Sequence, residues 1–153
     1  MPIYIKDNIT NVILAGNVID EDMKQSGFIP YEGIVPLTSE FEKLQLIDNV
    51  LTIKKDEEKI KIVLLPMVKE YINTITRQFH INNIDEIVKF LGFDNDFRTL
   101  AEELASWNAT VLSYTNKEIA KFLNGERKEL DSTSFIRELP KFRDIDIFKS
   151  EVL

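Results

Sequence analysis

The sequence predicts an α+β fold, with short N-terminal strands that include a β-hairpin or three-stranded meander, followed by a C-terminal helical bundle. Three observations lead to this prediction. Glycine and proline residues separate short apolar runs between positions 16 and 36. Apolar and polar residues alternate in runs between positions 44 and 65. From position 66 onward, apolar residues recur at intervals of three and four, the period of an amphipathic helix.

The composition is that of an ordinary folded protein, because 44% of the residues are hydrophobic and 29% are charged. A chain of 153 residues fits one domain, or a small domain with a structured arm. The net charge of -7 disfavours binding to the phosphate backbone of nucleic acids. Much of the acidity lies in the first 50 residues, which hold eight acidic and three basic side chains.

The chain has no cysteine, which excludes disulfides and cysteine-based metal sites and makes a reducing interior the simplest compartment. The N-terminus lacks a basic region followed by an apolar run, so we expect no signal peptide. No stretch approaches the roughly 18 apolar residues that a membrane helix needs. We therefore expect neither export by a signal peptide nor a membrane-spanning segment.

The first third is expected to form short strands and turns, with an apolar run at 11–15. Residues 20–27 could add one or two helical turns that end at Gly27. Residues 44–47 and 50–53 flank Asp48 and Asn49, a pair able to adopt the left-handed conformations of a tight turn, which predicts a β-hairpin.

The run at 59–65 alternates and then becomes apolar, a pattern that suits a third strand but could also begin a helix. Pro66 favours the strand, because proline disfavours helix at the preceding residue and is well tolerated in a helix's first turn. The predicted organisation is a β-rich N-terminal subdomain at 1–65, a helical domain at 66–142 and a C-terminal tail at 143–153.

Four helices are expected in the C-terminal half. The first spans about 66–79, and the second spans 84–91 with Asn82 or Asn83 as its cap and Gly92 as its stop. The longest begins at Asp94 or Asn95 and ends at Asn124 and Gly125, and the last follows Asp131 and stops at Pro140. Five apolar residues of these helices are the predicted structural core: Trp107, Leu104, Val111, Phe122 and Leu139.

Little in the sequence suggests catalysis. There is one histidine, no cysteine and no glycine-rich phosphate loop, so we predict no catalytic residue, no cofactor and no metal. His80 follows the first predicted helix, where a cation would interact favourably with the helix dipole. The acidic clusters at 20–22 and 94–96 lack the spacing of a calcium loop and are interpreted as solvated helix starts. The sequence thus favours a non-enzymatic protein.

One apolar cluster is interleaved with proline and glycine in a predicted loop region. Such a cluster either covers the helices or contacts another protein. Its members are the candidate partner-binding residues: Phe28, Ile29, Tyr31, Ile34 and Val35. The predicted hairpin also offers a strand edge to which another chain could add.

Several features of the C-terminal half occur in a characteristic order. A short helix at 84–91 precedes a helix with an alanine-rich start and a central tryptophan, Trp107; a Gly-Glu-Arg step follows at 125–127, and then a helix that ends in Glu-Leu-Pro-Lys-Phe at 138–142. In this order and spacing they resemble a group of small bacteriophage proteins that are commonly encoded among tail genes. Upstream, Gly-Phe-Ile-Pro-Tyr-Glu-Gly and Leu-Ile-Asp-Asn-Val-Leu are similar in style to small tail-fibre assembly proteins.

The sequence departs from that group at a few positions. Residues 79–82 stand where the group usually has Gly-Tyr-Asp, Asn108 stands where arginine is usual, and a second tryptophan is missing near Leu112. The resemblance implies a phage or prophage tail-associated protein, acting as a fibre-assembly chaperone or small structural component, with a tail or tail-fibre protein as partner. It implies a place in the host cytoplasm during assembly, or in the virion tail, and no catalytic residue. The broad helical stripe also permits a homo-oligomer.

A second hypothesis comes from the charge. A small acidic inhibitor could occupy a basic groove on a host defence or nucleic-acid enzyme and use the acidic N-terminal segment as its contact. Salt separates the two hypotheses, because charge-driven binding weakens with ionic strength and an apolar interface does not.

Overall fold

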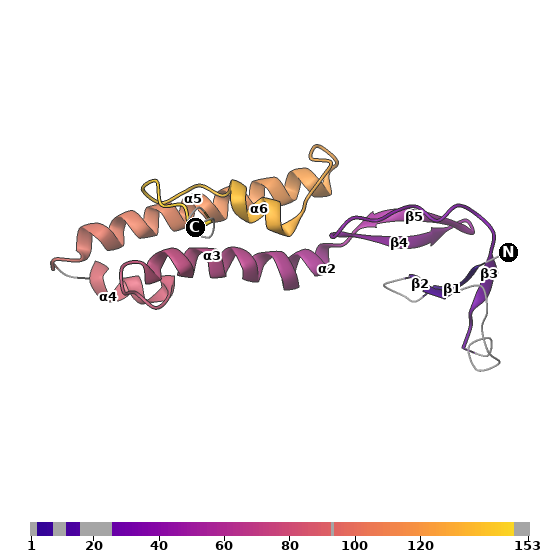
Figure 1. Cartoon of the computed structure of the whole chain (residues 1–153), viewed down its shortest axis with the longest axis horizontal. Coiled ribbons are helices and arrows are strands. Elements are labelled where there is room, and N and C mark those ends of the chain that lie inside the picture. The colour runs from indigo at the N-terminus through magenta and orange to yellow at the C-terminus, as the bar shows by residue number, and fades with distance from the viewer. Residues whose placement is uncertain (1–2, 8–11, 16–25, 93, 149–153) are drawn as a thin grey trace. The chain divides into compact units, whose positions relative to one another are not determined.

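The structure is a computed structural model that describes residues 3–7, 12–15, 26–92 and 94–148. The chain divides into two compact units, residues 1–57 and 58–153. The described strands belong to the N-terminal unit, and helices follow them (Figure 1). The predicted α+β class, with N-terminal strands and a C-terminal helical region, is confirmed.

The N-terminal unit contains a three-stranded antiparallel sheet in the order β2-β1-β3. Its strands are β1 (Ile3–Asp7), β2 (Val12–Ala15) and β3 (Ile29–Tyr31). Of the apolar run at 11–15, where a short strand was expected, residues 12–15 form β2, and residue 11 lies outside the described residues. The helical turns expected at 20–27 fall mostly outside the described residues.

The second sheet of this unit is the predicted β-hairpin, formed by β4 (Glu42–Ile47) and β5 (Val50–Lys55). Asp48 and Asn49 have φ of +49° and +63°, which is the left-handed pair that a two-residue hairpin turn requires. A small core joins the two sheets, with three buried residues and four partly buried ones around them: Ile5, Tyr31, Leu51, Val12, Val35, Leu44 and Leu46.

The strand predicted at 59–65 is wrong, because this run is helical. The chain continues from α2 (Glu57–Lys59) through a π-helical segment, η1 (Ile60–Leu64), into α3 (Leu65–Arg77). Ile60, Leu64 and Val68 are buried at a spacing of four, whereas Ile62 is 64% exposed. The helical period therefore outweighs the strand-like alternation, and the division between the units falls after Glu57 instead of after residue 65.

Pro66 does not end this helix, because it lies in the first turn of α3. A residue in the first turn of a helix needs no backbone N–H for that helix, so proline is tolerated at this position. The N–H of the preceding residue, Leu65, donates to the carbonyl of Ile60 in the wider π-helical turn. The expectation that proline favours a strand before it fails for this reason.

The C-terminal end of α3 is closed by His80. Its φ of +64° is left-handed, its N–H donates to the Arg77 carbonyl at 3.1 Å, and the N–H of Ile81 donates to the Thr76 carbonyl at 3.1 Å. This pair of bonds is the Schellman arrangement, in which glycine is the usual residue at the left-handed position. His80 is thus a helix-terminating residue, and its side chain is exposed.

The remaining helices are η2 (Ile84–Ile87), α4 (Val88–Leu91), α5 (Arg98–Leu123) and α6 (Ser132–Glu138). Figure 1 shows α3 and α5 running alongside each other, with α6 packed against them. Asp131 caps α6 by accepting from the Ser134 N–H at 3.0 Å, as predicted. The predicted cap of the helix that begins at Ile84 is wrong, because neither Asn82 nor Asn83 supplies it. The N–H of Ile84 donates instead to the side-chain oxygen of Asn73 in α3 at 2.9 Å.

Part of the predicted tail belongs to the helical unit. Phe142, the last residue of the predicted helical domain, is 3% exposed, and its ring centroid lies 5.6 Å from that of Trp107. In the predicted tail, Arg143 donates through Nη2 to Glu103 of α5 at 2.7 Å. Phe148 stacks on Tyr71 with ring planes 1° apart. The segment up to residue 148 therefore packs on the helices, and the rest of the predicted tail lies outside the described residues.

Candidate partner-binding site

The five candidate partner-binding residues divide into an inner and an outer set. Tyr31 is buried, and Phe28 and Val35 are half-buried. Ile29 and Ile34 are 48% and 87% exposed. The candidate cluster therefore both closes the small core of the N-terminal unit and presents apolar side chains to solvent.

Tyr31 holds the segment in place. Its hydroxyl donates to the backbone carbonyl of Ile34 at 3.2 Å and accepts from the backbone N–H of Leu51 at 3.0 Å. These bonds join the end of β3, the loop that follows it and the first part of β5. A loop fixed at its own backbone is preorganised for binding, because less conformational entropy is lost when a partner arrives.

Gly33 makes this arrangement possible. A Cβ atom at this position would lie 2.5 Å from the Tyr31 hydroxyl oxygen and 2.7 Å from its Cζ. Only glycine therefore allows the tyrosine ring to pass so close to the loop backbone.

An open hollow of about 740 Å³ lies beside this loop. Residues from the end of β3, the loop after it, the hairpin turn and the start of β5 line it: Pro30, Tyr31, Glu32, Gly33, Ile34, Pro36, Asn49, Val50 and Leu51. Val50 is 53% exposed, so the apolar surface continues from the loop onto β5.

Leu37 was missed by the sequence analysis, although it is 94% exposed and the most exposed large apolar side chain of the described residues. The predicted cluster stopped at Val35, before Pro36. The sequence does contain a signal for Leu37, because the polar residues Thr38, Ser39 and Glu40 begin only after it. The apolar run therefore ends at Leu37 and not at Val35. We name residues 28–37 the apolar segment from here on.

The five predicted core residues are buried in the C-terminal unit, where Trp107 contacts the Glu-Leu-Pro-Lys-Phe end of the resemblance. Trp107 is 7% exposed, and its indole N–H donates to the Pro140 carbonyl at 2.9 Å. The Tyr71 hydroxyl donates to the same carbonyl at 3.3 Å. Leu104, Val111, Phe122 and Leu139 are at most 3% exposed. The tryptophan and the Glu-Leu-Pro-Lys-Phe end thus contact each other and form part of the fold.

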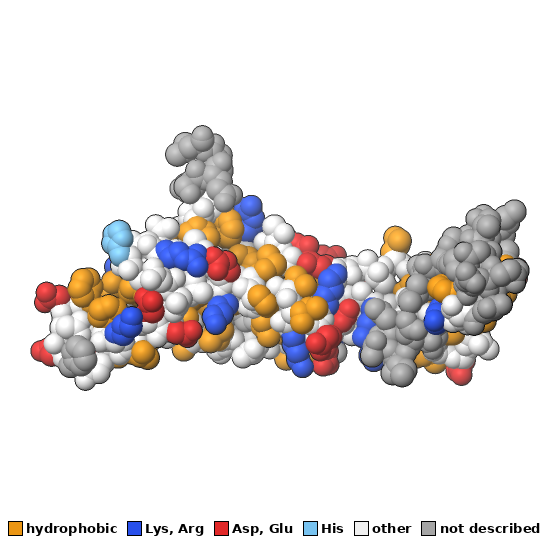
Figure 2. Space-filling view, turned by 90° about the horizontal axis from the view of Figure 1, so that it is seen from below, with side chains coloured by type: hydrophobic (Ala, Val, Ile, Leu, Met, Phe, Trp, Pro, Cys, Tyr) orange, Lys and Arg blue, Asp and Glu red, His pale blue; other side chains and the backbone are white. Residues whose placement is uncertain are grey.

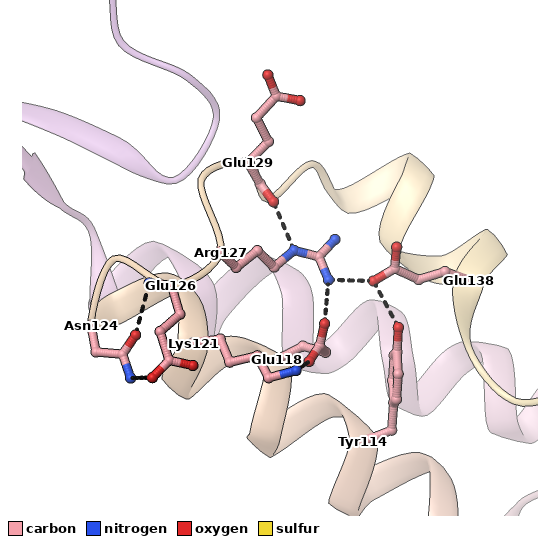
Figure 3. A network of polar contacts seen from close by, with 8 residues as sticks. All are labelled: Tyr114, Glu118, Lys121, Asn124, Glu126, Arg127, Glu129 and Glu138. Carbon is pink, nitrogen blue, oxygen red and sulfur yellow. Dashed lines mark hydrogen bonds and ion pairs between the residues drawn. The ribbon is translucent and has the colours of Figure 1, made fainter.

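The arginine of the Gly-Glu-Arg step is also a structural residue. Arg127 donates through Nη1 to Glu118 at 2.9 Å and to Glu138 at 2.6 Å, and through Nε to the Glu129 carbonyl at 2.7 Å (Figure 3). Tyr114 adds a bond to Glu138 at 3.1 Å. One guanidinium therefore ties α5, the loop after it and α6 together.

The charges of this network reinforce each other. The hydrogen bond to Glu138, followed by the bond to Glu118, raises the pKa of the Arg127 guanidinium. Bonds from Lys121 and then Arg127 lower the pKa of the Glu118 carboxyl. Burial, and next the charge of Glu138, raises the pKa of the Tyr114 hydroxyl. The shifts of Arg127 and Glu118 favour their ion pair over proton transfer, and the shift of Tyr114 keeps its hydroxyl protonated, which suits a structural role.

Within the described ranges, no group of three or more histidine or acidic side chains is placed to hold a metal ion. The acidic cluster at 20–22 lies outside those ranges. Across the part of the chain that the structure covers, no helix is long and apolar enough to cross a membrane. On the face of the helical unit shown in Figure 2, hydrophobic side chains alternate with charges of both signs, so this face presents no field of one sign.

Comparison of the chain with protein-family models, with curated proteins and with solved structures gives no match.

Proposed function

We propose that this chain is a non-enzymatic protein that binds another protein through the apolar segment, in the setting of bacteriophage tail assembly. The observation that carries the proposal is the exposure of Ile34 and Leu37, which are 87% and 94% exposed in a loop whose backbone Tyr31 anchors. Apolar side chains that are held outward contribute nothing to the unit's own core. A partner that covers them gains about 25 cal/mol for each Å² of apolar surface buried.

The tail setting is supported by the resemblance of the C-terminal half to small phage tail-module proteins. Its features, Trp107, the Gly-Glu-Arg step and the Glu-Leu-Pro-Lys-Phe end, all serve the packing of the helical unit. In this proposal the helical unit supplies a stable body and the N-terminal unit supplies the contact. The partner is a tail or tail-fibre protein, and the chain acts as an assembly chaperone or a small structural component.

A tagged chain recovered from phage-producing cells tests the proposal. We compare the unaltered chain with Ile34→Ser/Leu37→Ser and identify the co-purified proteins by mass spectrometry. Val88→Ser is the matched control, because Val88 is a 66% exposed apolar residue of the other unit. The expected result is recovery of a tail or tail-fibre protein by the unaltered chain and by the control, and its loss from the double variant.

Purified particles are analysed in parallel. Presence of the chain in the particle identifies a structural component, and absence identifies a chaperone that leaves after assembly. Partner recovery that the double variant retains would contradict the role of the apolar segment. Recovery of a host enzyme in a salt-sensitive manner would instead support the acidic-inhibitor hypothesis.

A further inference from the structure

The hairpin turn fixes which backbone groups of β5 point away from β4. In a two-residue hairpin the residues that flank the turn, here Ile47 and Val50, exchange both hydrogen bonds. The bonded positions of β5 then alternate, so Thr52 and Lys54 also bond to β4, while Leu51 and Ile53 direct their N–H and C=O groups outward.

Two hydrogen bonds agree with this alternation. The N–H of Asp56 donates to the Phe41 carbonyl at 2.8 Å, as expected for the next bonded pair. The N–H of Leu51 points outward and donates to the Tyr31 hydroxyl at 3.0 Å. Tyr31 therefore covers the start of the outer edge of β5, and in the described part of the chain neither backbone group of Ile53 has a partner of this kind.

The side chains around Ile53 favour an added strand. Ile53 is on the same face of the hairpin as Leu51, opposite Leu44, and this face closes the small core. Its side chain is nevertheless 39% exposed, because the sheet ends at β5. An apolar residue on a new strand, paired with Ile53, would extend this core by one row.

The other face of the hairpin has an unbalanced charge. Lys43 and Lys54 are directly opposite each other in the register, and like charges in that position repel. The described residues provide no ion pair for either lysine, whereas the neighbouring Lys55 pairs with Glu42 at 3.6 Å. An acidic residue on an added strand, beside Lys54, would relieve this repulsion.

We infer that β5 receives an extended segment of the partner protein as an antiparallel strand, with an apolar residue paired to Ile53 and an acidic residue paired to Lys54. The acidic residue comes immediately before the apolar one in the partner's sequence, because the strands are antiparallel. A second apolar residue, further toward the partner's C-terminus, enters the hollow beside Tyr31 and Val50. The inference rests on the proposed function and specifies the partner's chemistry.

A displayed library of random ten-residue peptides, selected against the full-length chain, tests the inference without knowledge of the natural partner. The expected selected peptides contain an acidic-apolar pair followed by a second apolar residue two to four positions later. Ile53→Pro is the edge-blocking variant, since proline removes an N–H that makes no bond to β4 and its ring obstructs the edge. We expect Ile53→Pro to weaken binding of the selected peptides about tenfold or more, and Ile53→Val to leave binding nearly unchanged.

Charge exchange provides a test that does not depend on the proline. Lys54→Glu should weaken binding of the selected peptides, and replacing their acidic residue by lysine should restore binding to Lys54→Glu but not to the unaltered chain. Selected peptides without the acidic-apolar pair, or with equal affinity for Ile53→Pro, would overturn the inference. So would self-association of the chain that Ile53→Pro abolishes, because the edge would then serve a second copy.

The two proposals fail in different ways. If Ile34→Ser/Leu37→Ser loses the cellular partner while Ile53→Pro and Lys54→Glu retain it, the apolar segment binds the partner and the strand addition is wrong. If all three variants retain the partner, both proposals are wrong.

Discussion

The Tyr31 hydroxyl accepts a hydrogen bond from the backbone N–H of Leu51 at 3.0 Å, across a separation of 20 residues. This bond covers the outward N–H of Leu51, a buried residue of the small core, and the same hydroxyl donates to the Ile34 carbonyl. The position of the apolar segment and the core of the N-terminal unit thus both depend on the Tyr31 side chain.

Replacing Tyr31 by phenylalanine should therefore destabilise the N-terminal unit. The ring remains, but the buried N–H of Leu51 loses its acceptor, which costs about 1–3 kcal/mol. Urea unfolding and amide hydrogen exchange measure the effect, and we expect the Leu51 N–H to exchange much faster in the variant. Tyr114→Phe, in the other unit, is the control and should leave Leu51 unchanged. Equal protection of Leu51 in Tyr31→Phe and the unaltered chain would contradict this bond.

Gly33→Ala tests the close approach of the same ring. The new Cβ would lie 2.5 Å from the Tyr31 hydroxyl oxygen, so the ring or the loop must move. Such overpacking costs about 1–3 kcal/mol. The cost should fall sharply in a Tyr31→Ala background, where the obstructing ring is absent. A double-mutant cycle on unfolding free energies measures this coupling, and additive effects would show that the two residues do not meet.

The sequence predicted the hairpin well because its signal is local. Asp48 and Asn49 tolerate left-handed conformations, and the flanking residues alternate, so turn and register follow from neighbouring positions. The run at 59–65 was misassigned because a short apolar stretch fits both periods. The deciding residue, Ile62, is exposed, and this depends on packing against distant helices.

In the candidate site, too, the sequence predicted what depends on neighbouring residues and missed what depends on distant ones. The interleaving of apolar residues with glycine and proline located the apolar segment. It could not show that Tyr31 turns inward while Ile34 turns outward, because that choice depends on Leu51, a residue of another strand. The outcome for His80 was foreseen only in part, since its place near a helix end was predicted but its left-handed backbone was not.

His80→Gly should stabilise the helical unit. A side chain at a φ of +64° costs about 1–2 kcal/mol, which glycine avoids, although glycine also loses more chain entropy on folding. We expect a net gain of about 0.5–1 kcal/mol in the free energy of unfolding, measured by urea at pH 8. His80→Ala keeps a Cβ and serves as the control, with no comparable gain. A loss of stability in His80→Gly would show that the imidazole makes a necessary contact.

Thr52→Val should also stabilise the chain. The Thr52 hydroxyl oxygen is buried and has no hydrogen-bond partner among the described residues, so the side chain bears a desolvation cost that valine of similar shape avoids. The expected gain is about 1 kcal/mol, with valine's preference for strands acting in the same direction. Thr52→Ser keeps the hydroxyl and should be less stable than both. If Thr52→Val lowers the unfolding free energy, the hydroxyl has a bonding role.

Glu118→Gln should reduce the dependence of stability on acid. Bonds from Lys121 and Arg127 lower the pKa of Glu118 from its ordinary value of 4.5, so its ionised form favours the folded state. This contribution is present above about pH 4.5 and is lost as pH falls through the lowered pKa of the folded state. We expect Glu118→Gln to be less stable than the unaltered chain at pH 7 and to approach it below that range. Glu126→Gln, in the loop that follows α5 and bonded only to Asn124 among the contacts of Figure 3, is the control. A stability difference that stays constant from pH 7 to pH 2 would show that Glu118 acts by packing and not by its charge.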